Sequence, residues 1–135
     1  MQQAGAGNIM AMDRWKKYIG CAYQNVRANM IMPIGYLMND QTFYYNISDV
    51  LARYAIKKII IGYPKHHEDA QKAIDIMVER LLLIDEKLNI EKVDEEYTSV
   101  QSWETTGDFT KNIAEDTVAA MHILETYLKN EKNNV

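Results

Sequence analysis

The sequence has little cysteine and no long hydrophobic run. Cys21 is its single cysteine, so no internal disulfide can form, and this usage fits a reducing compartment. The longest apolar runs, such as residues 59–61 and 81–84, are far shorter than the roughly 20 residues that a membrane-spanning helix requires. Residues 1–7 lack the basic and apolar segments of a secretory signal, and we expect them to form a disordered extension. These absences predict a cytoplasmic protein that does not enter a membrane.

Positive charge is scarce as well. The 135 residues include 15 lysines and arginines against 19 aspartates and glutamates, which gives a net charge of −4 at pH 7. A protein that coats nucleic acid neutralises many phosphates with basic side chains, so this balance counts against such a role. The net charge still allows a local basic patch beside an acidic centre. The length suits one domain that folds without a disulfide or a structural metal.

Hydrophobic patterns along the chain predict an α/β domain. We expect strands at residues 8–13, 17–23, 30–38, 57–63 and 90–95. We expect helices at residues 47–55, 70–82 and 111–129, with a short helix and loop at 98–107. Pro33 and Gly35 indicate that the third strand is bulged or lies at a sheet edge. Asn46 or Ser48 is expected to cap the first helix.

This order of elements predicts a mixed five-stranded sheet flanked by helices. Three strands in close succession form an antiparallel meander, and two crossover units then add two parallel strands. That arrangement matches the RNase H-like fold. We expect one such domain over residues 8–129, followed by a polar, frayed tail at residues 130–135.

Acidic residues stand at the ends of two predicted strands. Asp13 ends the first, and Asp94 and Glu95 end the last. Side chains at the carboxyl ends of strands can converge on one site, although a strand-end acid is more often simply solvated. Asp116 falls within the apolar stripe of the final predicted helix, four residues before Ala120. An inward-facing carboxylate must be paired, hydrogen-bonded or metal-bound, and the alternative is an acid that interacts with the N-terminal dipole of its helix.

Five segments of the chain resemble motifs of the YqgF (RuvX) family, in the family's order and approximate spacing. The resemblance extends from about residue 8 to residue 129. The segments are residues 12–22, similar to D-x-G-x-K-R-I-G-V-A; residues 33–34, similar to a short proline-containing strand; residues 60–64, similar to V-V-G-L-P; residues 94–99, similar to D-E-R-x-T-S; and residues 116–124, similar to D-x-x-A-A-x-x-I-L. The resemblance implies an RNase H-like, metal-dependent nuclease that acts on structured nucleic acid, in pre-16S rRNA processing or on branched DNA.

The resemblance also implies a set of catalytic residues. The catalytic acids and metal ligands would be Asp13, Glu95 and Asp116. Asp94 would be an alternative or supporting ligand, because strand alternation alone does not decide which of the adjacent pair points inward. Hard oxygen ligands suit Mg²⁺ or Mn²⁺, and two such ions about 4 Å apart can activate water and stabilise a departing oxygen. Phosphodiester cleavage at this acidic centre is the expected reaction.

Further residues are candidates for substrate binding. Lys17 is the retained cation of the first motif, with Arg14 and Lys16 beside it, and a solvated hairpin turn is the alternative interpretation. Thr98 and Ser99 belong to the fourth motif, where they are candidates for substrate contact or for the cap of a following helix. The expected partner of these residues is nucleic acid, either pre-rRNA or branched DNA.

Three residues depart from the family pattern. Trp15 stands where the family has glycine, and Tyr18 and Glu96 stand where it has arginine. These changes remove two cations that could hold a polyanion and add one negative charge.

A degenerate homologue that binds RNA or a protein partner without cleavage is therefore the first alternative. A nucleotide-binding module related to actin-like ATPases is the second, and the lack of a glycine-rich phosphate loop disfavours it. We expect a monomer or a weak homodimer.

Overall fold

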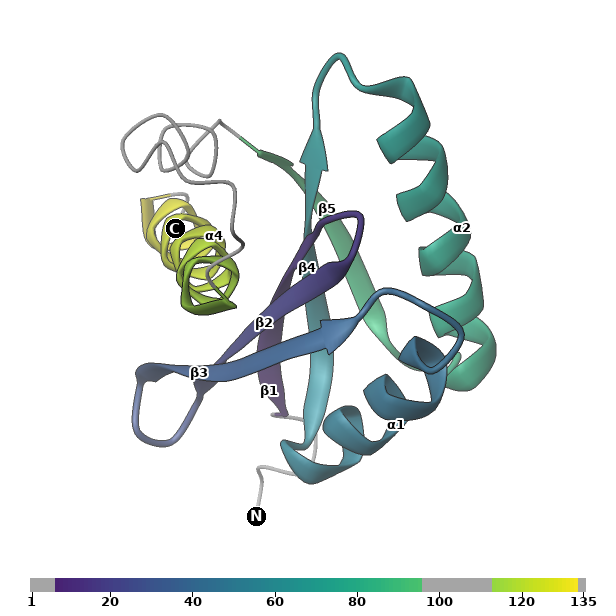
Figure 1. Ribbon diagram of the computed structural model, residues 1–135. Coiled ribbons are helices and arrows are strands. Elements are labelled where there is room, and N and C mark those ends of the chain that lie inside the picture. Colours follow the sequence, from purple (N-terminus) through teal and green to yellow (C-terminus); the bar gives the residue numbers. More distant parts are fainter. Residues whose placement is uncertain (1–6, 96–112, 134–135) are drawn as a thin grey trace.

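The computed structural model describes residues 7–95 and 113–133, which form a five-stranded sheet with helices on both faces (Figure 1). The strands are β1 (Asn8–Arg14), β2 (Tyr18–Asn25), β3 (Met30–Met38), β4 (Ile56–Pro64) and β5 (Asn89–Glu95). They lie in the order β3-β2-β1-β4-β5. β2 pairs antiparallel with β1 and β3, whereas β4 pairs parallel with β1 and β5. The predicted mixed sheet, a meander extended by two parallel strands, is confirmed.

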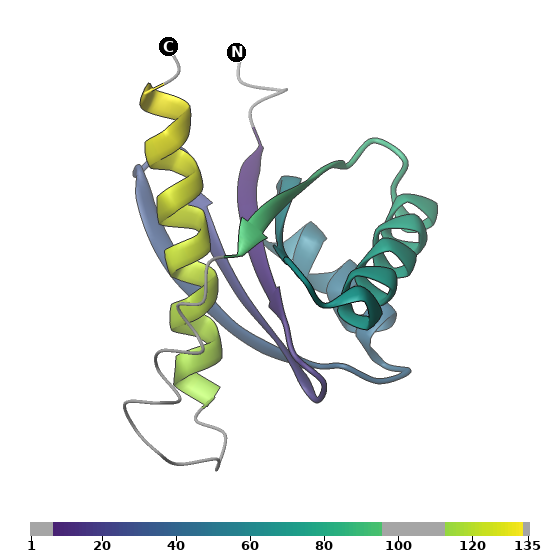
Figure 2. The ribbon, with the colours of Figure 1, turned by 90° about the horizontal axis from the view of Figure 1, so that it is seen from above.

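The helices divide between the two faces of the sheet. α1 (Phe43–Arg53) and α2 (Glu68–Ile84) cover one face, and α4 (Ile113–Asn133) covers the other (Figures 1 and 2). We call these the α1/α2 face and the α4 face. The short helix expected at residues 98–107 lies outside the described residues. None of the helices in the described part of the chain combines the length and the apolar character that crossing a membrane would take.

The start of α1 differs from the prediction. The helix begins at Phe43 after Thr42 as its N-cap, so neither Asn46 nor Ser48 caps it. Asp40 explains the earlier start, because its Oδ1 accepts hydrogen bonds from the Thr42 backbone N–H at 2.8 Å and from the Thr42 hydroxyl at 2.6 Å. This turn directs the chain into the helix, and the Phe43 side chain is then buried in the core.

The end of α4 also differs from the prediction. The helix continues through residues 130–133, which were expected to be part of a frayed tail, and ends at Asn133 instead of residue 129. These four residues include no proline or glycine, so nothing in their composition ends a helix. The polar side chains of Asn130 and Glu131 are exposed, which suits a helix end that extends into solvent.

Each face of the sheet carries its own hydrophobic core. β1 and β4 are central and covered on both sides, so their side chains alternate between the two cores and their sequences are continuously apolar. The core on the α1/α2 face includes Met10, Met12, Ile59 and Ile61. The core on the α4 face includes Ala11, Ile60, Leu124 and Tyr127. This alternation fixes the face of every other residue in these strands.

β3 is an edge strand with a bulge, as Pro33 and Gly35 predict. Gly35 lies opposite Cys21, whereas Pro33 lies opposite the next residue, Ala22, so Ile34 is the extra residue. Gly35 has a φ of 126°, a conformation that favours glycine over any residue with a side chain. The alternation of side chains along β3 therefore changes phase at Ile34.

Candidate active site

Asp13 is a buried carboxylate at the carboxyl end of β1. Its side chain is 1% exposed, and among the described residues only Thr117 is a second buried polar side chain. Because Met12 belongs to the core of the α1/α2 face, the next residue, Asp13, lies on the α4 face. Burial of a carboxylate costs several kcal/mol unless charges or hydrogen bonds compensate it. A residue of this kind marks a functional site or a structural polar network.

The Trp15 indole holds the Asp13 carboxylate. Its Nε1 donates a hydrogen bond of 2.7 Å to Asp13 Oδ2. Trp15 is itself fixed through its backbone, because its N–H donates to the Tyr18 carbonyl at 2.8 Å and its carbonyl accepts from Asn39 Nδ2 at 2.7 Å. The residue that replaces the family's glycine therefore contacts the first of the predicted catalytic acids directly. This contact could not be predicted from the sequence, since it depends on how the chain turns after β1.

Asp94 lies on the opposite face of the sheet from Asp13. It is paired in register with Tyr63, which packs against the core of the α1/α2 face. Its side chain is 64% exposed, and its Oδ2 lies 3.4 Å from Lys65 Nζ. The structure therefore does not bring Asp94 and Asp13 together.

The other predicted site residues are placed by their backbones alone. Glu95 is the last residue of β5, opposite Pro64 in register, and Asp116 lies in the first turn of α4. Figure 2 shows that α4 begins at the end of the sheet at which β1 ends. The side chains of Glu95 and Asp116, and the whole of Thr98 and Ser99, lie outside the described residues.

The buried stripe of α4 includes a residue that the sequence pattern did not reveal. The helix buries Thr117, Ala120, Leu124 and Tyr127, whereas Ala119 and Ile123 of the predicted stripe are only partly buried. Thr117 directly follows Asp116, so the first turns of α4 carry a buried hydroxyl on the α4 face. The spacing of residues 117, 120, 124 and 127 is regular enough to have indicated it, but a threonine does not stand out in an apolar pattern.

The predicted cations lie on the hairpin between β1 and β2. Arg14 is half-buried at the end of β1, and Lys16 and Lys17 are exposed in the turn that follows. All three are within four residues of Asp13 in the sequence. Arg14 is paired with Ile19 of the core on the α1/α2 face, so its position is on the face opposite Asp13. The exposed Lys16 and Lys17 are the cations that a polyanion can reach at the hairpin.

Two polar networks fasten β5, the strand that ends in Glu95. On the α1/α2 face, Lys92 Nζ donates to Asp75 Oδ1 of α2 at 2.5 Å, which holds the pKa of Asp75 below its usual value. On the α4 face, Lys58 Nζ lies 3.3 Å from Glu91 Oε1 and donates to the Tyr127 hydroxyl of α4. β5 is thus tied to both helix layers.

The donor chemistry at Asp13 fits a divalent cation. A buried carboxylate is a hard oxygen ligand of the kind that Mg²⁺ and Mn²⁺ prefer. The side chains described include no group of three or more histidine, cysteine, aspartate or glutamate residues that could hold a metal ion. Since Glu95 and Asp116 are outside that set, this finding concerns Asp13 and the exposed acids only.

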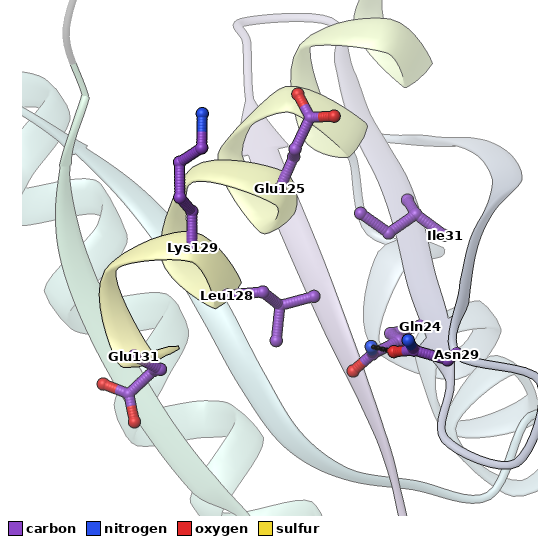
Figure 3. A pocket seen from close by; sticks show the side chains of 7 residues that line it. All are labelled: Gln24, Asn29, Ile31, Glu125, Leu128, Lys129 and Glu131. Carbon is purple, nitrogen blue, oxygen red and sulfur yellow. Dashed lines mark hydrogen bonds between the residues drawn. The ribbon is translucent and has the colours of Figure 1, made fainter. Parts of the chain in front are cut away.

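A cleft of about 610 Å³ lies elsewhere in the molecule, between the β2–β3 hairpin and the C-terminal half of α4 (Figure 3). Its lining residues are Gln24, Asn29, Ile31, Glu125, Leu128, Lys129 and Glu131. Gln24 is paired with Ile9 at the beginning of β1, so the cleft is at the other end of the sheet from Asp13. Asp13, the buried acid among the described side chains, does not line it, and the cleft is not the candidate active site.

The arrangement of the sheet and helices is that of the RNase H-like proteins. The fold is similar to that of T. thermophilus RuvC, solved in complex with a Holliday junction substrate, with a TM-score of 0.55 and 7% sequence identity over 91% of this chain and 95% of that one. It is also similar to the fowlpox virus Holliday junction resolvase, with a TM-score of 0.56 and 15% identity over 91% of this chain and 99% of that one. At such low identity these likenesses show the fold alone.

Sequence comparison then assigns the family. Residues 7–130 match the model of the RuvX family, described as Holliday junction resolvase, and the chain belongs to this family. Its relatives include the "Putative pre-16S rRNA nuclease" of Malacoplasma penetrans (strain HF-2), 31% identical over 136 residues that cover 92% of this chain and 95% of the relative. The protein of that name in Sulfurihydrogenibium sp. (strain YO3AOP1) is 29% identical over 89% of this chain and 88% of the relative. The predicted resemblance is confirmed: the chain is a nuclease of the YqgF (RuvX) type, a phosphodiester-cleaving hydrolase.

Proposed function

We propose that this nuclease requires a divalent cation and cleaves structured RNA, with pre-16S rRNA as its substrate. The observation that carries the proposal is the buried Asp13 carboxylate at the carboxyl end of β1, on the face where α4 begins. The names of the two relatives support the choice of pre-16S rRNA over branched DNA. A carboxylate at this place suits a cation-binding site, because it supplies a hard oxygen ligand at the end of the sheet where α4 begins.

The proposed ligands are Asp13, Glu95 and Asp116. Along β5, Glu91 and Val93 contact the α4 side, whereas Asp94 is paired with Tyr63 of the opposite core. Alternation along the strand then assigns position 95 to the α4 face. For this reason we propose Glu95, and not Asp94, as the second ligand. Asp116, in the first turn of the helix that covers this face, is the third.

The residues of the site have distinct proposed roles. A bound Mg²⁺ or Mn²⁺ would supply Lewis-acid chemistry that activates water and stabilises the departing oxygen. Trp15 orients the Asp13 carboxylate through its hydrogen bond to Oδ2. Lys16 and Lys17 position the phosphates of the substrate from the β1–β2 hairpin.

Thr98 and Ser99 follow β5 in the sequence and are proposed as further contacts to the substrate. They belong to the motif that also contains Glu95, one of the proposed ligands. Serine and threonine hydroxyls commonly bind phosphate oxygens in protein–nucleic acid complexes.

One observation favours a second candidate function. The Trp15 indole already occupies one oxygen of Asp13, where the family's glycine leaves the carboxylate without this contact. If the Trp15 hydrogen bond takes the place of a metal ion at Asp13, the protein would bind RNA without cutting it. The two candidates differ in whether the acids bind a cation.

The test is a metal titration of matched variants. Mn²⁺ binding is followed by isothermal titration calorimetry on the parent chain, Glu95→Gln and Asp94→Asn, and cleavage of a pre-16S rRNA fragment is measured in parallel. We expect Glu95→Gln to lose Mn²⁺ binding and cleavage, and Asp94→Asn, its neighbour on the other face, to retain both. The reverse result would reassign the ligand. A parent chain that binds the RNA but neither binds Mn²⁺ nor cleaves would establish the non-cleaving candidate.

A further inference from the structure

Two tyrosines form an aromatic pair on the α4 face, beyond Asp13. The rings of Tyr18 on β2 and Tyr36 on β3 meet edge to face, with centroids 5.0 Å apart and planes at 85°. Tyr36 is 37% exposed, and Met38, paired with Tyr18 in register, is 42% exposed. Tyr18 is half-buried, and the exposed surface of Tyr36 beside it is available for a ligand.

The register of the sheet aligns this pair with Asp13. Asp13 lies opposite Gly20, and Gly20 lies opposite Tyr36, so the three residues form one row across β1, β2 and β3. Their positions share the α4 face. Gly20 has no side chain, so β2 contributes none between the carboxylate and the ring. Neighbouring strands are about 4.8 Å apart, which places the Tyr36 backbone roughly 10 Å from that of Asp13.

α4 does not extend over this corner of its face. Figure 2 shows that the first part of β3 passes beneath α4 and that the last part of β3 leaves α4. Figure 1 shows the same divergence. Tyr36 and Met38 belong to this last part of β3. Near the beginning of β3, Ile31 packs against the core under α4, and the residue before it, Met30, is exposed. The end of β3 is where the exposed aromatic surface gathers.

The chemistry of the pair matches a nucleobase better than a phosphate. Tyr18 stands where the family pattern has arginine. An aromatic ring therefore replaces a cation that could bind the phosphate backbone of a nucleic acid. Every nucleobase has a flat π-face, and unpaired bases stack on exposed aromatic side chains. Bases within a helix are already stacked and cannot make this contact.

We propose that Tyr18 and Tyr36 form a platform on which an unpaired base stacks while the adjoining phosphodiester lies at Asp13. The substrate class that follows is nucleic acid with a single-stranded segment beside a helix, and not a continuous duplex. The inference rests on the proposed nuclease site, since it uses Asp13 to define where the cleaved bond lies.

The experiment compares two RNA hairpins that share one stem, one blunt and one with a short unpaired tail that contains 2-aminopurine. Binding is measured by fluorescence anisotropy at one salt concentration, with Ca²⁺ as the divalent ion. We expect Tyr36→Leu to weaken binding of the tailed hairpin about ten-fold, the loss expected for one stacked base, and to leave the blunt hairpin unchanged. Tyr36→Phe keeps the ring and is expected to bind both hairpins as the parent does.

Tyr45→Leu is the matched control. Tyr45 is 83% exposed on α1, on the other side of the sheet, and its loss is expected to change neither affinity. The parent is expected to quench 2-aminopurine fluorescence when it binds, and Tyr36→Leu to lose this quenching, which a merely structural defect in a folded variant would not cause. Thermal unfolding confirms that each variant folds.

The outcomes separate the platform from the nuclease site. An equal loss on both hairpins, or no loss on either, would overturn the platform while RNA binding by the parent still stood. A parent chain that bound neither hairpin would overturn the proposed function together with the platform.

Discussion

Removal of the Trp15 indole N–H tests whether its hydrogen bond compensates the burial of Asp13. Trp15→Phe deletes a donor that lies 2.7 Å from a carboxylate with a 1% exposed side chain. The hydrogen bonds of the Trp15 backbone with Tyr18 and Asn39 persist in the variant. A hydrogen bond to a charged group contributes about 1.5 to 3 kcal/mol, and because Trp15 is only half-buried we expect about 1.5 kcal/mol. For a domain of this size that corresponds to a fall in Tm of about 5 °C.

A double-mutant cycle with Asp13→Ala identifies the source of this loss. Unfolding is followed by circular dichroism in the presence of a chelator, so that metal binding does not contribute to stability. In the Asp13→Ala background the acceptor is absent, and Trp15→Phe should cost only a few tenths of a kcal/mol. The coupling free energy between Trp15 and Asp13 is then about 1 kcal/mol or more. This is well above the deviation from additivity that independent sites show. Equal costs of Trp15→Phe in both backgrounds, or a parent-like Tm for Trp15→Phe, would show that the hydrogen bond does not stabilise the carboxylate.

Three further results are expected. Asp116→Asn should keep the parent's circular dichroism spectrum and abolish cleavage, because it removes the charge that a hard cation needs; cleavage at the parent's rate would leave Asp116 a structural role only. RNA affinity should fall only shallowly with salt, by about 0.7 to 0.9 log units per neutralised phosphate per decade, because the cations of the β1–β2 hairpin offer few phosphate contacts; a steep slope would reveal a larger basic surface. Cys21 should resist iodoacetamide at pH 8 until the protein unfolds, since burial raises the pKa of its thiol to about 12; rapid labelling of the native chain would contradict its burial.

The sequence pattern predicted the sheet because each strand has its own local signal. The run Ile59–Ile61 indicates a strand buried on both faces, and β4 is such a strand in the centre of the sheet. The start of α1 was missed because its capping depends on Asp40, which precedes the apolar spacing of the helix. Local periodicity identifies the middle of an element better than its first turn.

The site was only partly predictable, because faces are set by pairing between strands. Asp94 and Glu95 are equivalent in sequence, and only the register that places Asp94 opposite Tyr63 assigns Asp94 to the α1/α2 face. The contact of Trp15 with Asp13 and the approach of Tyr18 to Tyr36 likewise depend on how the hairpins turn. Neither has a signature in the linear sequence.

The extra residue in β3 separates this edge strand into two parts with different surroundings. A bulge bends a strand and increases its twist, and Ile34 lies between the part of β3 that packs under α4 and the part that leaves it. With an unbroken alternation, Tyr36 would share the face of Met32, and Leu37 would leave the core of the α1/α2 face. One inserted residue thus makes two functionally separate segments from a single strand, one that anchors a helix and one that presents aromatic surface.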